Sequence, residues 1–136
     1  MTHERRAQIA MIAQRHGVAV VEDDIHALLT EEPPPPLSAF APEISYSITS
    51  TSKVLTPGLR IGFLLAPPGM GERLAAGIRA TTWAAAPLMA EIASAWIRDG
   101  TADLILDDRR REAAARQKLA RKVLAGADYR AHPRGY

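Results

Sequence analysis

The stretch TSTSKVLTPGLRIGF, residues 49–63, decides the fold that we expect for this chain. It joins two apolar segments, ISYSIT (residues 44–49) and RIGFLLA (residues 60–66), through a short polar loop. In this loop Lys53 lies among small hydroxyl residues, ahead of a Pro-Gly turn and Arg60. Because a buried charge is costly unless it is paired, a lysine in this position indicates a ligand or an ionic partner.

The flanking segments predict strands of one sheet. Ile44, Tyr46 and Ile48 alternate with polar residues, which is typical of a strand with one buried face. Upstream, VAVVEDD (residues 18–24) has four apolar residues before three carboxylates, as in a buried strand that runs into a polar loop. If these two strands are parallel neighbours, their polar tips open on the same edge, and an acid and a lysine face one pocket.

Helical patterns surround the strands. Thr2 can cap a helix to about residue 16, and three further helices are expected near residues 70–80, 85–98 and 102–125. The helix at 85–98 carries two adjacent apolar rows, which predict deep burial. The order indicates an α/β fold. Three strands leave exposed sheet edges, and HPRGY (residues 132–136) looks like the approach to another strand, so we expect a fragment truncated at both ends.

Composition excludes several function classes. A chain of 136 residues with 47% hydrophobic and 24% charged content suits one globular domain. Without cysteine there are no disulfides, thiolate nucleophiles or cysteine zinc sites, and we expect a cytoplasmic protein. The net charge of +2 is too small to argue for nucleic acid, and the scattered histidines show no metal-ligand spacing.

The two polar tips together suggest one small molecule. A partly desolvated Lys53 amine can form a Schiff base with a carbonyl. The hydroxyls of Ser50 and Ser52, with the guanidinium of Arg60, can bind phosphate oxygens, and Asp23 can hold a heterocyclic nitrogen protonated. An aldehyde, a phosphate and a ring nitrogen together describe pyridoxal 5′-phosphate (PLP).

Simpler interpretations stand beside this one. Taken alone, Lys53 reads as a surface lysine, and Ser50 and Ser52 as turn residues. The triplet Arg109–Arg111 favours a solvated helix face over nucleic-acid binding, because acidic residues flank it. Trp83 and Trp96 suggest packing in a core or a subunit interface.

Two segments, VVEDDIHALL (residues 20–29) and STSKVLTPGLRIGFLLAP (residues 50–67), carry a family resemblance. They resemble the large domain of fold-type I PLP-dependent aminotransferases, closest to the branch fused to GntR-type regulators of the MocR kind. The resemblance implies a partial three-layer α/β/α sandwich in which the strand at 60–66 is antiparallel. Residues 1–100 would be part of the PLP-binding large domain, and residues 101–136 a long helix and the start of the connection to a small domain.

The resemblance also implies roles for the site residues. Lys53 would form the Schiff base with PLP and then move a proton, and Asp23, preferred over Asp24 by the family spacing, would pair with the pyridine nitrogen. His26 lies where many members carry a tyrosine that bonds the ring oxygen. Three residues would hold the phosphate: Ser50, Ser52 and Arg60.

The expected function is amino-group transfer between an amino acid and a 2-oxo acid. The alternative is an effector domain that senses PLP or an amino compound in a GntR/MocR-type transcriptional regulator, with nucleic acid bound only by a missing N-terminal domain. A third possibility is an inactive fragment. The resemblance implies a homodimer for the parent protein, and the residues that choose the substrate are expected outside this chain.

Overall fold

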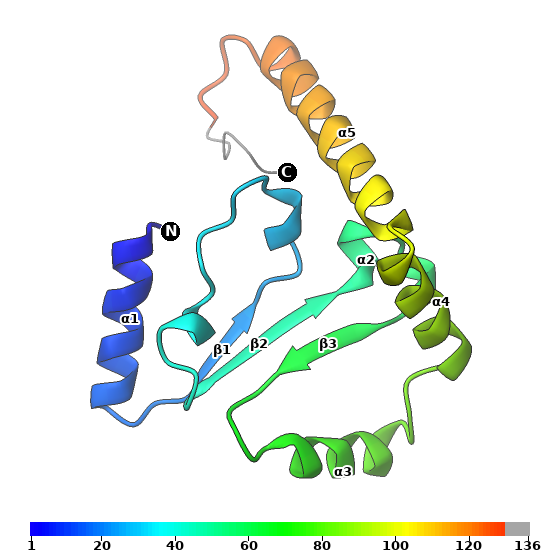
Figure 1. Cartoon of the computed structure of the whole chain (residues 1–136). Coiled ribbons are helices and arrows are strands. Elements are labelled where there is room, and N and C mark those ends of the chain that lie inside the picture. The colour runs from blue at the N-terminus through cyan, green and yellow to red at the C-terminus, as the bar shows by residue number, and fades with distance from the viewer. Residues whose placement is uncertain (130–136) are drawn as a thin grey trace.

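The elements of the fold follow the order expected from the sequence (Figure 1). The computed structural model describes residues 1–129, so the strand approach expected at 132–136 and the end of the 101–136 unit lie outside the described residues. The described elements are α1 (His3–Arg15), β1 (Val20–Asp23), the 3₁₀ turns η1 (Ala27–Leu29) and η2 (Leu37–Ala39), β2 (Ser45–Ser50), α2 (Thr51–Val54), η3 (Pro57–Leu59), β3 (Gly62–Leu65), α3 (Gly71–Thr81), α4 (Pro87–Arg98) and α5 (Thr101–Val123).

The three strands form one sheet in the order β1-β2-β3. β1 and β2 are parallel, with Asp23 opposite Ile48, and β3 is antiparallel to β2, with Gly62 opposite Ser50. This pairing confirms the α/β class, the parallel neighbours and the antiparallel third strand. The end of β1, the end of β2 and the start of β3 therefore meet at one edge of the sheet.

Helix α1 is attached beside β1 through a buried ion pair. Thr2 caps the helix by accepting a hydrogen bond from the Arg5 amide at 3.3 Å. Arg6 pairs with Glu22 of β1, and both side chains are close to nine-tenths buried. The other Glu22 oxygen accepts a hydrogen bond from the Leu37 amide at 2.7 Å. Glu22 thus joins three segments, and its side chain lies on the opposite face of the sheet from that of Asp23, because neighbouring strand residues face opposite sides.

A cluster of buried apolar residues includes the segment that carries Lys53. Its members come from η1, α2, η3, α4 and the residues beside them, and are Leu29, Val54, Leu55, Leu59, Ile61 and Ala93. Because four of the six, Val54, Leu55, Leu59 and Ile61, lie between the end of α2 and the start of β3, the backbone on both sides of the Pro-Gly turn is fixed by apolar burial. The cluster therefore positions the loop.

Helix α4 is less buried than its sequence predicts. Only Ala93 is buried, whereas Leu88 is 67% and Ile97 55% exposed. A single stripe made by Met89, Ala90, Ile92, Ala93 and Trp96 packs on the core, and Leu88 and Ile97 lie outside this stripe. The prediction of a deeply buried helix is wrong for residues 1–129.

The two tryptophans differ. Trp96 packs against the core, as expected. Trp83 has a left-handed backbone (φ 68°) and is 78% exposed, so the prediction that it lies in a core is wrong within the described residues. Its place in a subunit interface stays a prediction.

None of the helices in residues 1–129 has both the length and the apolar composition that a membrane-spanning helix needs.

Candidate functional site

The end of β1 presents Asp23 on the sheet edge. The Asp24 amide donates to the Ile48 carbonyl at 2.9 Å, which extends the parallel ladder one residue beyond the strand. The Asp23 carboxylate is exposed and accepts a hydrogen bond from the Ile25 amide at 3.4 Å. This short turn leaves carboxylate lone pairs available at the edge.

The carboxylate next to Asp23 has a different environment. Asp24 is half-buried, and burial followed by the charge of Glu22 raises the pKa of its carboxyl group, with a smaller opposing effect of Arg6. Glu22 is held by Arg6 and Leu37. Of the three consecutive acids, Asp23 is therefore the one that is both exposed and placed on the edge.

We expect the substitution Asp24→Asn to stabilise the chain slightly at neutral pH. The raised pKa means that the folded chain binds this proton more tightly than the unfolded chain does. Protonated Asp24 therefore adds to the free energy of unfolding, fully below the ordinary carboxyl pKa of 3.8. This stabilisation is lost as pH rises through the raised pKa, so the charged carboxylate is unfavourable in the folded chain at neutral pH. The gain should stay within about 0.5 kcal/mol, as for most surface changes. Urea unfolding between about pH 3 and pH 7 checks it, since an equal effect at both ends contradicts the assignment.

The end of β2 runs directly into the short helix α2, which carries Lys53. Thr51 is buried, and both its amide and its hydroxyl donate to the Ile61 carbonyl, at 3.0 Å and 3.2 Å. Ser50 caps the helix by accepting from the Ser52 amide at 3.3 Å, and its hydroxyl proton remains free to donate to a ligand. This bonding ties the Lys53 segment to the start of β3.

Lys53 itself is exposed. The expectation of a partly desolvated lysine is therefore wrong for residues 1–129, because the described chain buries Thr51 and Val54 of the same helix but leaves Lys53 exposed to solvent. A cavity of about 240 Å³ between α2 and α5 reaches Ser50, but Lys53, Asp23 and Arg60 do not line it. The side chains of Asp23, Lys53 and Arg60 are all exposed in the described structure.

Arg60 follows the Pro-Gly turn in a strained conformation. Thr56 caps η3, Leu59 is buried, and Arg60 has φ 54° and ψ 31°. This left-handed region is uncommon for residues other than glycine and costs on the order of 1 kcal/mol or more. The neighbouring Ile61 is buried and bonded to Thr51, so the surrounding structure holds Arg60 in this conformation near the Lys53 segment.

The cations of the edge have no partner inside the described chain. Within residues 1–129, neither the Lys53 ammonium nor the Arg60 guanidinium forms an ion pair or a hydrogen bond. The register brings together five predicted residues at one edge: Asp23, Ser50, Ser52, Lys53 and Arg60. His26, the sixth, is exposed and precedes η1, the turn that follows Asp23. An unpaired amine, a guanidinium, free hydroxyls and a carboxylate can together bind an anionic aldehyde.

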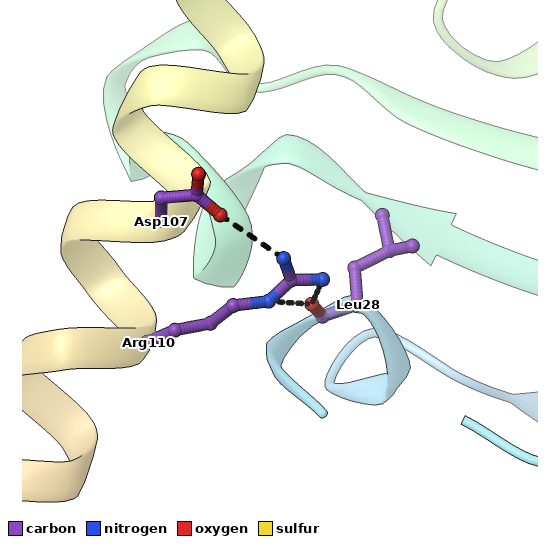
Figure 2. A network of polar contacts seen from close by, with 3 residues as sticks. All are labelled: Leu28, Asp107 and Arg110. Atoms are coloured by element: carbon purple, nitrogen blue, oxygen red, sulfur yellow. Dashed lines mark hydrogen bonds and ion pairs between the residues drawn. The ribbon is translucent and has the colours of Figure 1, made fainter. Parts of the chain in front are cut away.

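Two arginines of α5 contact the same region and were not predicted to do so. The Arg109 guanidinium donates to the Leu55 carbonyl at 3.2 Å, and Arg110 donates twice to the Leu28 carbonyl (Figure 2). The prediction of a solvated face holds for Arg111, which pairs with Asp108, and for the exposed Arg109, although Arg109 also reaches the Leu55 carbonyl. It is wrong for Arg110, which is half-buried. The partners lie 54 and 82 residues away in the sequence, so no local pattern could have revealed them.

Comparison with known proteins gives the family. The aminotransferase class I and II family matches residues 1–134. YdeF, an HTH-type transcriptional regulator of Bacillus subtilis, is 29% identical over 126 residues, which are 93% of this chain and 27% of the regulator. The chain belongs to the aminotransferase class I and II family.

Solved structures show the same fold. The multiple substrate aminotransferase of Thermococcus profundus superposes with a TM-score of 0.88 at 21% identity, covering 100% of this chain and 36% of that protein. The α-aminoadipate aminotransferase LysN of Thermus thermophilus, complexed with N-(5′-phosphopyridoxyl)-L-leucine, superposes with a TM-score of 0.82 at 24% identity, covering 96% and 36%. The chain thus spans about a third of the length of these enzymes.

Proposed function

We propose that the sheet edge formed by Asp23, Lys53 and Arg60 is one side of a PLP site, and that the protein transfers amino groups between an amino acid and a 2-oxo acid. The observation that carries the proposal is the unpaired Lys53 ammonium on the same edge as an available carboxylate and an unpaired guanidinium. The family and the phosphopyridoxyl ligand of LysN support it.

The residues present fit the cofactor. The Lys53 amine is free to bind the aldehyde, and Asp23 keeps a lone pair for the protonated ring nitrogen. Arg60 has a strained backbone, and within residues 1–129 no carboxylate pairs with its guanidinium, which leaves that group available for phosphate. The hydroxyls of Ser50 and Ser52 are the further phosphate ligands that we propose, and His26 would lie toward the ring oxygen.

The side chains of this site would then have separate roles in the reaction. Bound PLP supplies an electron sink for the carbanion at the substrate's Cα. The Lys53 amine would be the group that carries the proton between the substrate's Cα and the cofactor, as general base and then as general acid. The Asp23 carboxylate keeps the ring nitrogen protonated, and Arg60 with the two serines prevents the ring from shifting.

A second function uses the same residues. The similarity to YdeF favours an effector domain of a transcriptional regulator, in which PLP or an amino compound is bound without turnover. In that case nucleic acid would be contacted by a separate domain. A homodimer and a cytoplasmic location remain predictions under both functions.

A covalent trapping experiment tests the proposal. The protein is incubated with PLP, reduced with borohydride and digested, and the labelled peptide is identified by mass spectrometry. We expect the pyridoxyl group on Lys53. Label spread evenly over Lys53, Lys118 and Lys122 would contradict a built site. Transfer from common amino donors to 2-oxo acids then separates the enzyme from the sensor, which binds PLP without turnover.

A further inference from the structure

We infer that Arg109 and Arg110 are positioning residues that attach both polar tips of the site to one helix, α5. Each arginine bonds a backbone carbonyl close to a different tip, and the two are neighbours in the sequence. The significance of this clamp for PLP rests on the function proposed above, but the clamp itself depends only on the contacts below.

The first attachment holds the turn that follows Asp23. Arg110 donates from Nε at 3.0 Å and from Nη2 at 2.8 Å to the Leu28 carbonyl, and its Nη1 pairs with Asp107 at 3.1 Å (Figure 2). Leu28 belongs to η1, five residues after Asp23. Because three nitrogens of the guanidinium are used, its orientation is fixed, and so is the position of the carbonyl.

The second attachment holds the helix that carries Lys53. Arg109 donates from Nη2 to the carbonyl of Leu55, the residue that ends α2 and lies two positions after Lys53. Carbonyls at the end of a helix lack intrahelical donors, and a cation there also opposes the negative end of the helix dipole. Arg109 therefore completes the end of α2.

Packing alone does not place this part of α5. The helix has no buried residue, and its contacts with the core come from Ala102, Ile105 and Leu106 in its first two turns. Beyond Leu106 the attachments to the tips are polar. Since consecutive helical residues point about 100° apart, neighbouring arginines can reach two different segments. A movement of α5 must then displace the Asp23 turn and the Lys53 helix together.

Hydrogen–deuterium exchange of the protein, followed by mass spectrometry, tests the clamp. We expect Arg110→Ala, which removes both charge-assisted hydrogen bonds to the Leu28 carbonyl, to speed exchange of residues 24–30 by at least about tenfold and to leave residues 51–56 unchanged. Arg109→Ala should do the reverse. Arg110→Lys, which replaces the fork by one ammonium, should restore part of the protection. The matched control is Arg111→Ala, because Arg111 and its partner Asp108 are both about three-quarters exposed.

Three outcomes would overturn the clamp: neither segment responds, both respond equally to each variant, or Arg111→Ala has the same effect. PLP titration provides the second readout. Arg109→Ala and Arg110→Ala should each weaken PLP binding and shift the absorption of the bound cofactor, whereas Arg111→Ala should do neither. If the unmodified protein binds no PLP, the proposed function fails while the exchange pattern still decides the clamp.

Discussion

The substitution Lys53→Ala is expected to abolish covalent capture of PLP and to reduce amino-group transfer by at least about 100-fold, the contribution typical of a positioned acid–base group. The expected loss has a simple cause: alanine supplies neither a nucleophilic nitrogen nor a proton carrier. Lys53 is exposed and lies on a short helix whose stability depends on Thr51 and Val54. The fold should therefore tolerate the change, which circular dichroism can confirm.

Lys118→Ala is the matched control for this prediction. Lys118 is also exposed and helical but lies on α5, away from the sheet edge. Borohydride trapping, mass mapping and a transfer assay should give unmodified behaviour for this control. The proposal for Lys53 is wrong if the Lys53→Ala protein still retains covalent PLP at another residue with undiminished transfer.

Glu22→Ala is expected to cause the largest loss of stability, about 3 kcal/mol or more. The substitution leaves the Arg6 charge buried without its partner and removes the acceptor of the Leu37 amide. For a domain of this size the change corresponds to a fall in Tm on the order of 10 °C. Urea unfolding and calorimetry measure it. Glu22→Gln, which can still accept from Leu37, should lose less.

The control for this second prediction is Glu112→Ala on α5. Glu112 pairs with Arg116 at 2.7 Å, but both side chains are more than half exposed. Exposed pairs of this kind contribute at most about 0.5 kcal/mol. Equal losses for Glu22→Ala and Glu112→Ala would show that the Arg6–Glu22 pair does not join α1 to the sheet.

Local patterns in the sequence were sufficient for the elements and for the edge of the site. Two strands are indicated by the alternation at Ile44, Tyr46 and Ile48 and by the apolar run before Glu22. If these strands are parallel neighbours, their carboxyl ends must lie at the same edge of the sheet, and β1 and β2 are indeed parallel. The Pro-Gly turn before Arg60 indicates the reversal that brings β3 back along β2. These features depend on neighbours in the sequence, so periodicity and turn chemistry reveal them.

Features that depend on distant segments could not be predicted in this way. The exposure of Lys53 and of one side of α4 depends on which residues lie above them, and no local pattern reports that. The Arg6–Glu22 pair joins α1 to β1 across the intervening turn, and the Arg110–Leu28 contact spans 82 positions. The sequence pattern of a helix does not distinguish a charged side chain that is solvated from one that donates a hydrogen bond to a distant carbonyl.

The left-handed backbone at position 60 has a consequence for how this residue would evolve. Glycine adopts that conformation without strain, so selection for heat tolerance alone would favour glycine there. Only pressure to keep a permanent positive charge at the turn opposes that drift. Among descendants of this chain, an arginine kept at position 60 would therefore indicate that the site still binds a phosphate group, and a glycine there would indicate that it does not.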